Sequence, residues 1–145
     1  MQQFRKLNKG KMPVRPFYQP KQKGLDVKSI LVVDDDFAMR RGMALMLQGE
    51  GYEVFEAGDG RQALQALGEN PVDLVILDLF LPGRDGIEIA QEIGAGSFHA
   101  KILLLTAYGD HARAKEAQQI FQENYLEKIS LERTLPEKVR EILKA

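Results

Sequence analysis

Short apolar runs alternate along the chain with longer segments in which apolar residues recur at helical spacing, beginning at Ile30. The runs are rich in Val, Ile and Leu, which is typical of strands buried on both faces of a sheet. The longer segments are typical of amphipathic helices, and the stripe of Met39, Met43 and Met46 in the first of them is interpreted as core packing. The predicted strands are 30–33, 52–57, 74–77, 102–105 and 124–127, and the predicted helices are 37–48, 61–67, 87–93, 111–119 and 132–144.

The strict alternation of five strands with five helices predicts an α/β fold in which helices cover both faces of a parallel sheet. At 145 residues the chain has room for one such domain. It contains no Cys, which excludes a disulfide framework and thiolate chemistry. No apolar run approaches the ~20 residues that a membrane-spanning helix needs. We therefore expect no membrane span and a cytoplasmic location.

The charge of the chain divides unevenly near residue 28. Residues 1–28 carry eight basic residues and one acidic residue, a net charge of +7, and include Pro13, Pro16 and Pro20. Residues 29–145 carry twelve basic and twenty acidic residues, a net charge of −8. We therefore predict a disordered or loosely docked basic arm over 1–28 and a folded domain over 29–145. The arm could bind the acidic domain, an anionic partner or a membrane surface, or could be a leader without a specific role.

Polar residues follow four of the predicted strands. Asp34 and Asp35 come directly after the first strand, Asp78 after the third, Thr106 after the fourth and Lys128 after the fifth. All strands of a parallel sheet end at the same edge, which is where open α/β sheets bind ligands. We therefore expect one cleft that holds several carboxylates, a hydroxyl and an ammonium. Carboxylates this close repel one another unless a cation neutralises them, so the cleft is a candidate divalent-metal site.

This set of side chains suits the transfer of a phosphoryl group to an aspartate. The attacking carboxylate and the phosphoryl group are both anionic, and a divalent cation lowers their repulsion. Mg²⁺ prefers oxygen ligands and keeps waters and phosphate oxygens in its shell. An ammonium and a hydroxyl can contact the remaining phosphoryl oxygens.

Four segments of the chain resemble the receiver domain of two-component response regulators, of the chemotaxis-regulator type. They are 30–41 with its Asp-Asp-Asp run, 73–86 with Asp-Leu-Phe-Leu-Pro-Gly, 103–107 with Leu-Leu-Leu-Thr-Ala, and 125–128 with Tyr-Leu-Glu-Lys. Each segment alone is a weak pattern, whereas four in this order and spacing are specific. The resemblance covers about 30–144 and implies a flavodoxin-like, doubly wound (βα)5 fold with strand order 2-1-3-4-5.

The resemblance also implies a role for the acidic residues. Asp78 would be the phosphorylated nucleophile. Asp35, Asp78 and the backbone carbonyl of Phe80 would ligate Mg²⁺, which Mn²⁺ could replace. Asp34 would bind the metal through water or directly. Asp36 lies one place beyond the acidic pair and is interpreted as a solvated loop carboxylate.

The same resemblance implies a phosphorylation-dependent switch. Lys128 and Thr106 would bind phosphoryl oxygens, and Thr106 would move inward once the aspartate is phosphorylated. Tyr125 matches the family's switch aromatic, although half-buried packing is an alternative interpretation. The phosphoryl donor would be a sensor histidine kinase or a phosphotransfer protein. The response would change what binds the face formed by the fourth helix, the fifth strand and the fifth helix, around 109–144.

Two departures from the family pattern bear on this interpretation. Ile129 stands where most receivers have Pro, so the peptide bond after Lys128 is not expected to favour the cis form. Phe121 and Gln122 stand where Gly-Ala is common, which removes an inexpensive helix C-cap.

Two aromatic residues near the predicted site and the two His residues of the chain receive different interpretations. Phe80 and Tyr108 lie two residues beyond the predicted acceptor and the predicted hydroxyl, and we expect them to limit the access of water to an aspartyl phosphate. His99 and His111 are far apart in the sequence and are interpreted as surface residues rather than ligands.

Several alternatives stay open at this stage. A pseudo-receiver would keep the fold and bind a protein without phosphorylation. A haloacid-dehalogenase-like phosphohydrolase would need an acidic residue where Phe80 stands, and a Rossmann domain would need a G-x-G-x-x-G after the first strand. As a receiver, the chain is a signalling domain that catalyses its own phosphorylation and dephosphorylation, not an enzyme acting on a metabolite. Its length leaves no room for a DNA-binding domain, and Met1 and a complete last helix favour a stand-alone receiver over a fragment; a homodimer is compatible with either.

Overall fold

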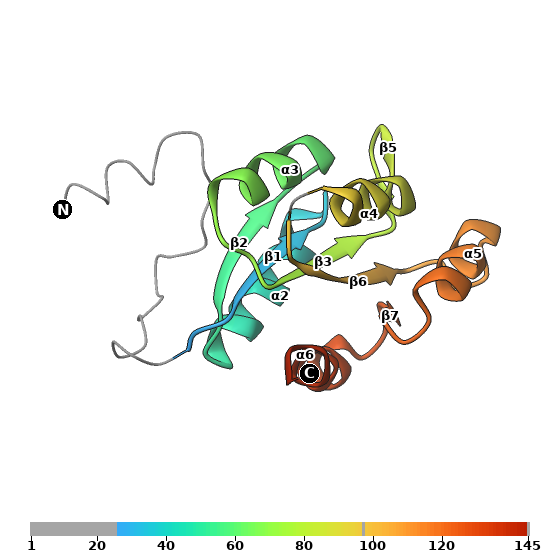
Figure 1. The fold of residues 1–145 in the computed structure, drawn as a ribbon. Coiled ribbons are helices and arrows are strands. Elements are labelled where there is room, and N and C mark those ends of the chain that lie inside the picture. Colours follow the sequence, from blue (N-terminus) through green and yellow to red (C-terminus); the bar gives the residue numbers. More distant parts are fainter. Residues whose placement is uncertain (1–25, 97, 145) are drawn as a thin grey trace.

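The computed structural model describes residues 26–96 and 98–144 and contains all ten predicted elements (Figure 1). Only residues 26–28 of the predicted basic arm fall within this range, so that prediction lies outside the described residues. The long strands are β1 (Ser29–Val33), β2 (Glu53–Ala57), β3 (Leu74–Asp78), β6 (Lys101–Thr106) and β7 (Tyr125–Glu127). The helices are α2 (Phe37–Gly49), α3 (Gly60–Glu69), α4 (Gly86–Ala95), α5 (Ala112–Phe121) and α6 (Leu131–Lys144).

The five long strands form one parallel sheet in the order β2-β1-β3-β6-β7. This confirms the predicted order, 2-1-3-4-5 when the long strands alone are numbered. The chain moves outward from β1 to β2 and then returns to place β3 on the other side of β1. Such a reversal opens a crevice at the carboxyl ends of the two central strands, β1 and β3.

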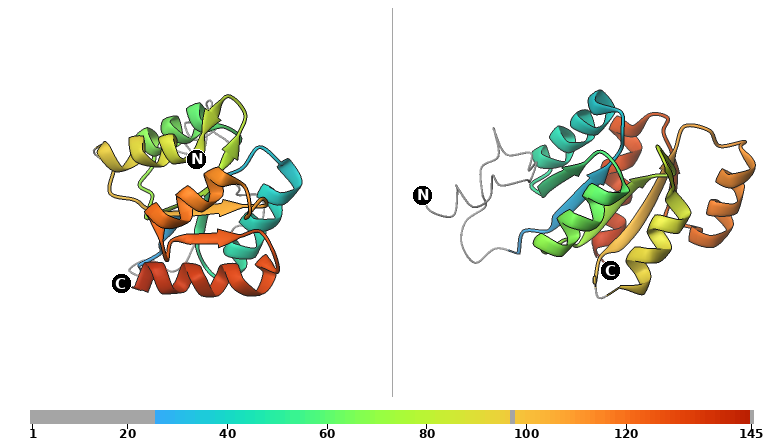
Figure 2. Two further views of the ribbon diagram at one scale, coloured as in Figure 1. Left: turned by 90° about the vertical axis from the view of Figure 1, so that its right-hand side faces the viewer. Right: turned by 90° about the horizontal axis from the view of Figure 1, so that it is seen from above.

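Helices cover both faces of the sheet, as the alternation of elements predicts (Figure 2). Leu31 and Val33 of β1 pack in one apolar cluster with α3, α4 and α5, while Ile30 and Val32 pack in the other with α2 and α6. These four side chains are at most 1% exposed. Each contributes about 2 kcal/mol by leaving water, so the apolar core can hold the sheet together without a bound metal.

The predicted methionine stripe belongs to the second of these clusters. Met43 is buried, and Met39 and Met46 pack against the cluster from the partly buried rim of α2. This confirms their interpretation as core packing. No described helix has the length and apolar character that crossing a membrane requires.

A two-stranded hairpin, absent from the sequence prediction, lies between β3 and α4. Its strands are β4 (Phe80–Leu81) and β5 (Arg84–Asp85). Gly83 has φ +74 at the turn, a conformation that other residues adopt only at a cost. Gly86 follows the hairpin, and a Cβ there would lie 2.6 Å from the Leu79 Cα, so only glycine lets α4 begin against the end of β3.

The two departures from the receiver pattern both have a structural outcome. No peptide bond in the described part of the chain is cis, so the Lys128–Ile129 bond is trans. The C-cap residue of α5, Gln122, has φ 50, a conformation that glycine adopts more easily. This positive φ lies one residue after Phe121, which stands at the family's usual Gly position.

Candidate functional site

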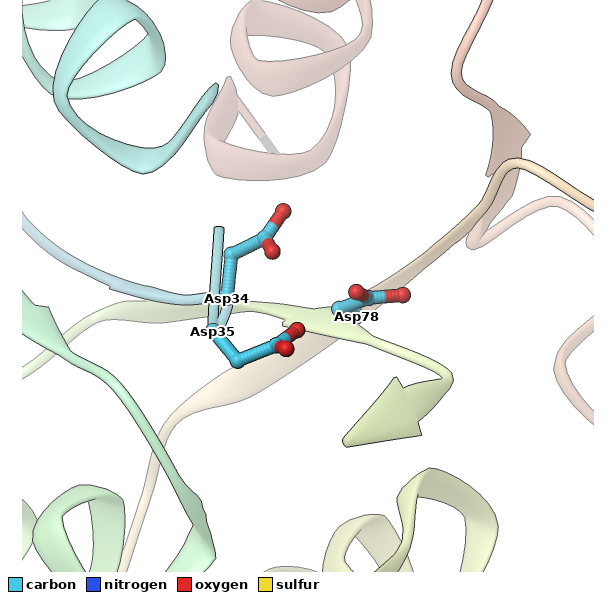
Figure 3. A group of neighbouring side chains, drawn as sticks. All are labelled: Asp34, Asp35 and Asp78. Atoms are coloured by element: carbon cyan, nitrogen blue, oxygen red, sulfur yellow. The ribbon is translucent and has the colours of Figure 1, made fainter. Parts of the chain in front are cut away.

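Three carboxylates meet at the carboxyl edge of the two central strands (Figure 3). Asp34 and Asp35 follow β1, and Asp78 is the last residue of its neighbour β3. One carboxylate oxygen from each of the three lies within 4.8 Å of the others. Asp34 is fully buried, Asp78 is 7% exposed and Asp35 is exposed, so the group opens to solvent on one side.

The Lys128 ammonium lies between two of these carboxylates. Its Nζ donates to Asp34 Oδ2 at 2.6 Å and to Asp78 Oδ2 at 3.2 Å. Burial works against the charged ammonium, but the hydrogen bond to Asp34 and the two negative charges prevail and raise the pKa of Lys128. The absence of Pro after Lys128 therefore does not keep its ammonium out of the site.

The Asp78 carboxyl group holds its proton more tightly than usual. Burial raises its pKa to about 6, and the nearby Asp34 charge acts in the same direction, while Lys128 opposes both. The Phe80 N–H donates to Asp78 Oδ1 at 3.2 Å and also favours the ionised form. One ammonium thus leaves three clustered carboxylates short of positive charge.

This shortage is what a divalent cation with oxygen ligands would relieve, so the residues fit Mg²⁺. The Asp34 carboxylate already accepts from the Asp36 N–H at 2.9 Å and from Lys128. By contrast, the Asp35 carboxylate makes no hydrogen bond or ion pair with any residue in the described ranges. Of these two neighbours, Asp35 is therefore the better placed to bind a cation directly.

Asp36 is exposed and lies outside the three-carboxylate group, as expected for a solvated residue. It also has a structural task that its interpretation as a loop carboxylate missed. Its Oδ1 accepts from the Met39 N–H at 3.1 Å and caps the N-terminus of α2. An Asp followed by a helical segment is the usual signal for such a cap.

Thr106 and Tyr125 lie on the far side of the site. Thr106 is fully buried at the end of β6, and its hydroxyl accepts from the Tyr108 N–H at 3.0 Å. Tyr125 of β7 pairs with Leu104, two residues before Thr106, so the two side chains are diagonal neighbours on one face of the sheet. The Tyr125 hydroxyl is buried without a hydrogen-bond partner among the described residues, and burial, with the Glu127 charge, raises its pKa.

Three aromatic rings gather beside the hairpin. Phe80 packs edge-on against Tyr108, with ring centroids 5.6 Å apart, and against His111 at 4.8 Å. His99 and His111 are both exposed, as predicted, but His111 also caps α5 because its Nδ1 accepts from the Arg113 N–H at 3.0 Å. The sequence predicted Phe80 and Tyr108 beside the site, whereas the contact with His111 had no sequence signal.

Two ion-paired groups near the site were also missed. Asp85 caps α4 and pairs with Arg113 of α5. Glu56 of β2 is buried and pairs with both Arg40 and Arg41 of α2. The side chains come from different elements, so no local pattern pairs them.

Comparison with known sequences identifies the family. The family profile described as the response regulator receiver domain matches residues 30–140. The chain belongs to this family. Its receiver domain is 34% identical over 93 residues to sporulation initiation phosphotransferase F of Bacillus subtilis, a match that covers 64% of this chain and 75% of that protein.

Larger regulators match the same region. The receiver is 46% identical over 81 residues to the DNA-binding response regulator MtrA of Mycobacterium tuberculosis. This match covers 56% of the present chain but only 35% of MtrA. The chain thus spans about a third of the length of this relative.

Solved structures confirm the flavodoxin-like fold of the receiver. The response regulator TrrA of Thermotoga maritima, solved in complex with Mg²⁺ and BeF, is 42% identical with a TM-score of 0.71, and the match covers 81% of this chain and all of that one. A CheY-like receiver protein from Methanospirillum hungatei is 28% identical with a TM-score of 0.74, covering 82% of this chain and 95% of that one.

Proposed function

We propose that this receiver is a phosphorylation-dependent switch that accepts a phosphoryl group on Asp78 from a sensor histidine kinase or a phosphotransfer protein. One observation carries the proposal: Asp78 ends a central strand beside Asp34 and Asp35 and contacts the Lys128 ammonium. A relative solved with Mg²⁺ and the phosphoryl mimic BeF supports the same chemistry. The protein acts in this role as a signalling domain rather than as an enzyme that turns over a metabolite.

In the transfer step, an Asp78 carboxylate oxygen forms a bond to phosphorus while the bond from phosphorus to the donor's nitrogen breaks. The electron pair of the broken bond leaves with the donor imidazole. The Asp35 and Asp78 carboxylates and the Phe80 carbonyl oxygen would hold Mg²⁺, or Mn²⁺ in its place. When bound there, the cation would supply positive charge against the charge that builds up on the phosphoryl oxygens. Lys128 supplies a positive contact from the opposite side.

The response would spread through the α5-β7-α6 face. Thr106 releases its contact with the Tyr108 N–H and binds a phosphoryl oxygen, and its diagonal neighbour Tyr125 then repacks. Two observations support a rearrangement there: the unpartnered Tyr125 hydroxyl and the positive φ of Gln122. The output would be a change in protein binding on this face, with a partner protein or a second copy of the chain.

The aromatic group at the site suggests a slow loss of the phosphoryl group. Phe80 lies two residues after Asp78, and the exposed Tyr108 lies two residues after Thr106. Their rings pack against each other. We infer that they hinder the approach of a hydrolytic water. Phe80→Asn should then shorten the lifetime of the phosphorylated protein, and an unchanged lifetime would contradict this inference.

The direct test is phosphorylation in vitro. The protein is incubated with Mg²⁺ and acetyl phosphate, and covalent modification is followed by intact-protein mass spectrometry. We expect modification that Asp78→Asn abolishes. Asp36→Asn is the matched control, because it changes an exposed carboxylate of the same acidic run and Asn keeps the helix cap.

An unmodified wild type would sink the switch proposal. It would favour the alternative, a pseudo-receiver that binds proteins without phosphorylation. A phosphohydrolase remains the weaker alternative, because Phe80 offers no general acid or base two residues after Asp78.

A further inference from the structure

A buried carboxylate at the end of β2 holds two consecutive arginines of α2. The Glu56 side chain is 3% exposed. Its Oε1 accepts from Arg40 Nε at 2.8 Å, and its Oε2 accepts from Arg41 Nε at 2.9 Å. A buried carboxylate is stable only with such partners, so Glu56 fixes both guanidinium groups in place.

The two arginines are alike in these contacts and differ in a third. Each guanidinium carbon also lies 5.3 Å from the centroid of the Phe37 ring. Within the described ranges, Arg40 alone of the two has a further hydrogen bond: its Nη1 donates to the backbone carbonyl of Asp34 at 2.7 Å. Arg40 thus joins the buried Glu56 to the first residue of the acidic group, and Arg41 does not.

The Asp34 carbonyl belongs to the peptide unit that carries Asp35. This unit is planar, so a hydrogen bond to its oxygen fixes the direction in which the chain continues into Asp35. The Asp34 N–H is held as well, by the Ala57 carbonyl at 3.1 Å. Since the Asp35 carboxylate has no partner of its own in the described part of the chain, its position depends on this backbone.

We propose that Arg40 is a positioning residue for the divalent-cation site, holding the Asp34–Asp35 peptide so that the Asp35 carboxylate faces Asp78. Glu56 is the anchor that fixes Arg40 in turn. The inference rests on the proposed Mg²⁺ site and adds to it a residue that touches neither the cation nor the phosphoryl group.

Positioning and simple electrostatics predict opposite signs for the loss of Arg40. Removing a positive charge close to a cation site strengthens the binding of a cation by Coulomb's law. Removing a group that orients a ligand weakens binding, and for residues that orient metal ligands the loss is typically about tenfold or more. The sign of the change therefore separates the two effects.

The experiment measures Mg²⁺ affinity by titration calorimetry on the full chain, for the wild type, Arg40→Gln and Arg41→Gln. We expect about tenfold weaker binding for Arg40→Gln. Arg41→Gln is the matched control, since it loses an equivalent ion pair with Glu56 and an equivalent contact with the Phe37 ring but leaves the hydrogen bond from Arg40 to the Asp34 carbonyl in place. Its Mg²⁺ affinity should be unchanged or slightly higher. Thermal unfolding in EDTA reports the stability of each variant separately from its affinity.

Equal affinities for the two variants, or tighter binding by Arg40→Gln, would overturn the positioning role while leaving the proposed function intact. A wild type that binds no Mg²⁺ would overturn both. If Arg40→Gln does not fold, Arg40→Lys replaces it. Lysine keeps a charge beside Glu56 but lacks the planar fork that reaches two acceptors, so weaker Mg²⁺ binding is again expected and wild-type affinity would refute the proposal.

Discussion

The two sides of the carboxyl edge of the sheet differ in whether all of their buried polar groups have hydrogen-bond partners. At the ends of β1 and β3, the N–H, the carbonyl and both carboxylate oxygens of Asp34 each have a hydrogen-bond partner. At the ends of β6 and β7, the Tyr125 hydroxyl is buried without one among the described residues, and Gln122 has a positive φ. The first side suits chemistry at fixed positions. The second side contains an unpartnered hydroxyl and a strained backbone, and a rearrangement could relieve both.

Lys128 joins the two sides, because it follows β7 and its ammonium reaches the carboxylates after β1 and β3. Lys128→Ala should have the largest effect, since it leaves the fully buried Asp34 without a cation. We expect the free energy of unfolding at pH 7 in EDTA to fall by about 3 kcal/mol. Denaturant unfolding measures this. Lys115→Ala, at an exposed lysine of α5, is the control and should change stability by at most about 0.5 kcal/mol.

A second experiment tests how the ionisation of Asp78, at the end of β3, changes the stability of the fold. The pKa of Asp78 is raised from its usual 3.8 to about 6, so between these pH values the folded protein keeps a proton that the unfolded chain has released. This group therefore stabilises the fold below about pH 4, and its contribution is lost as the pH rises to about 6. Asp78→Asn removes the effect, and in EDTA it should gain about 1 to 2 kcal/mol on the wild type between pH 4 and 7, allowing for solvent screening. A constant difference between the two proteins across this range would contradict the prediction.

The side formed by the ends of β6 and β7 can be tested by removing the unpartnered hydroxyl of Tyr125. Tyr125→Phe deletes a buried polar group that makes no hydrogen bond with the described residues, so stability should rise by about 1 kcal/mol. Thermal unfolding of the apo protein measures the change. Tyr108→Phe, at a ring that is 63% exposed, should be neutral. A loss of stability in Tyr125→Phe would show that the hydroxyl has a partner in solution.

The smallest expected effect is at the end of α5. Gln122→Gly should stabilise the protein by about 0.5 to 1 kcal/mol, because glycine adopts the observed φ of 50 without steric cost. Gln119→Gly, inside the same helix, is the opposing control and should cost about 1 kcal/mol. If both substitutions destabilise, the strain at residue 122 is absent in solution and the contrast between the two sides is weaker.

The sequence was sufficient to predict the parallel sheet and to predict that the polar residues at its strand ends lie together. The strands β1, β3 and β6 are largely runs of buried apolar residues. Parallel strands end at one edge, so Asp34, Asp35, Asp78 and Lys128 had to converge. The roles that the family resemblance assigns to them stay predictions. The family's pattern pointed to Phe121 as the place of the missing glycine, whereas the positive φ falls on its neighbour Gln122.

The hairpin and the ion pairs could not be predicted in the same way. Strands of two residues, such as β4 and β5, are too short to show a period. Glu56 reads as a surface residue because charged side chains are rarely buried, and its burial depends on two arginines from a different element. Such contacts depend on tertiary packing, which local sequence patterns do not record.

The Asp85 carboxylate links two helices, which has a mechanical consequence. The same carboxylate caps α4 at the end of the hairpin that follows Asp78 and pairs with Arg113 of α5. We therefore expect a displacement of that hairpin to reach α5 through this ion pair at the surface. Both partners of this link are part-exposed, with 29% and 28% of their side chains accessible, and dissolved ions weaken such pairs. We expect the coupling between that hairpin and α5 to weaken as the ionic strength rises, whereas the buried contacts of Lys128 should change little.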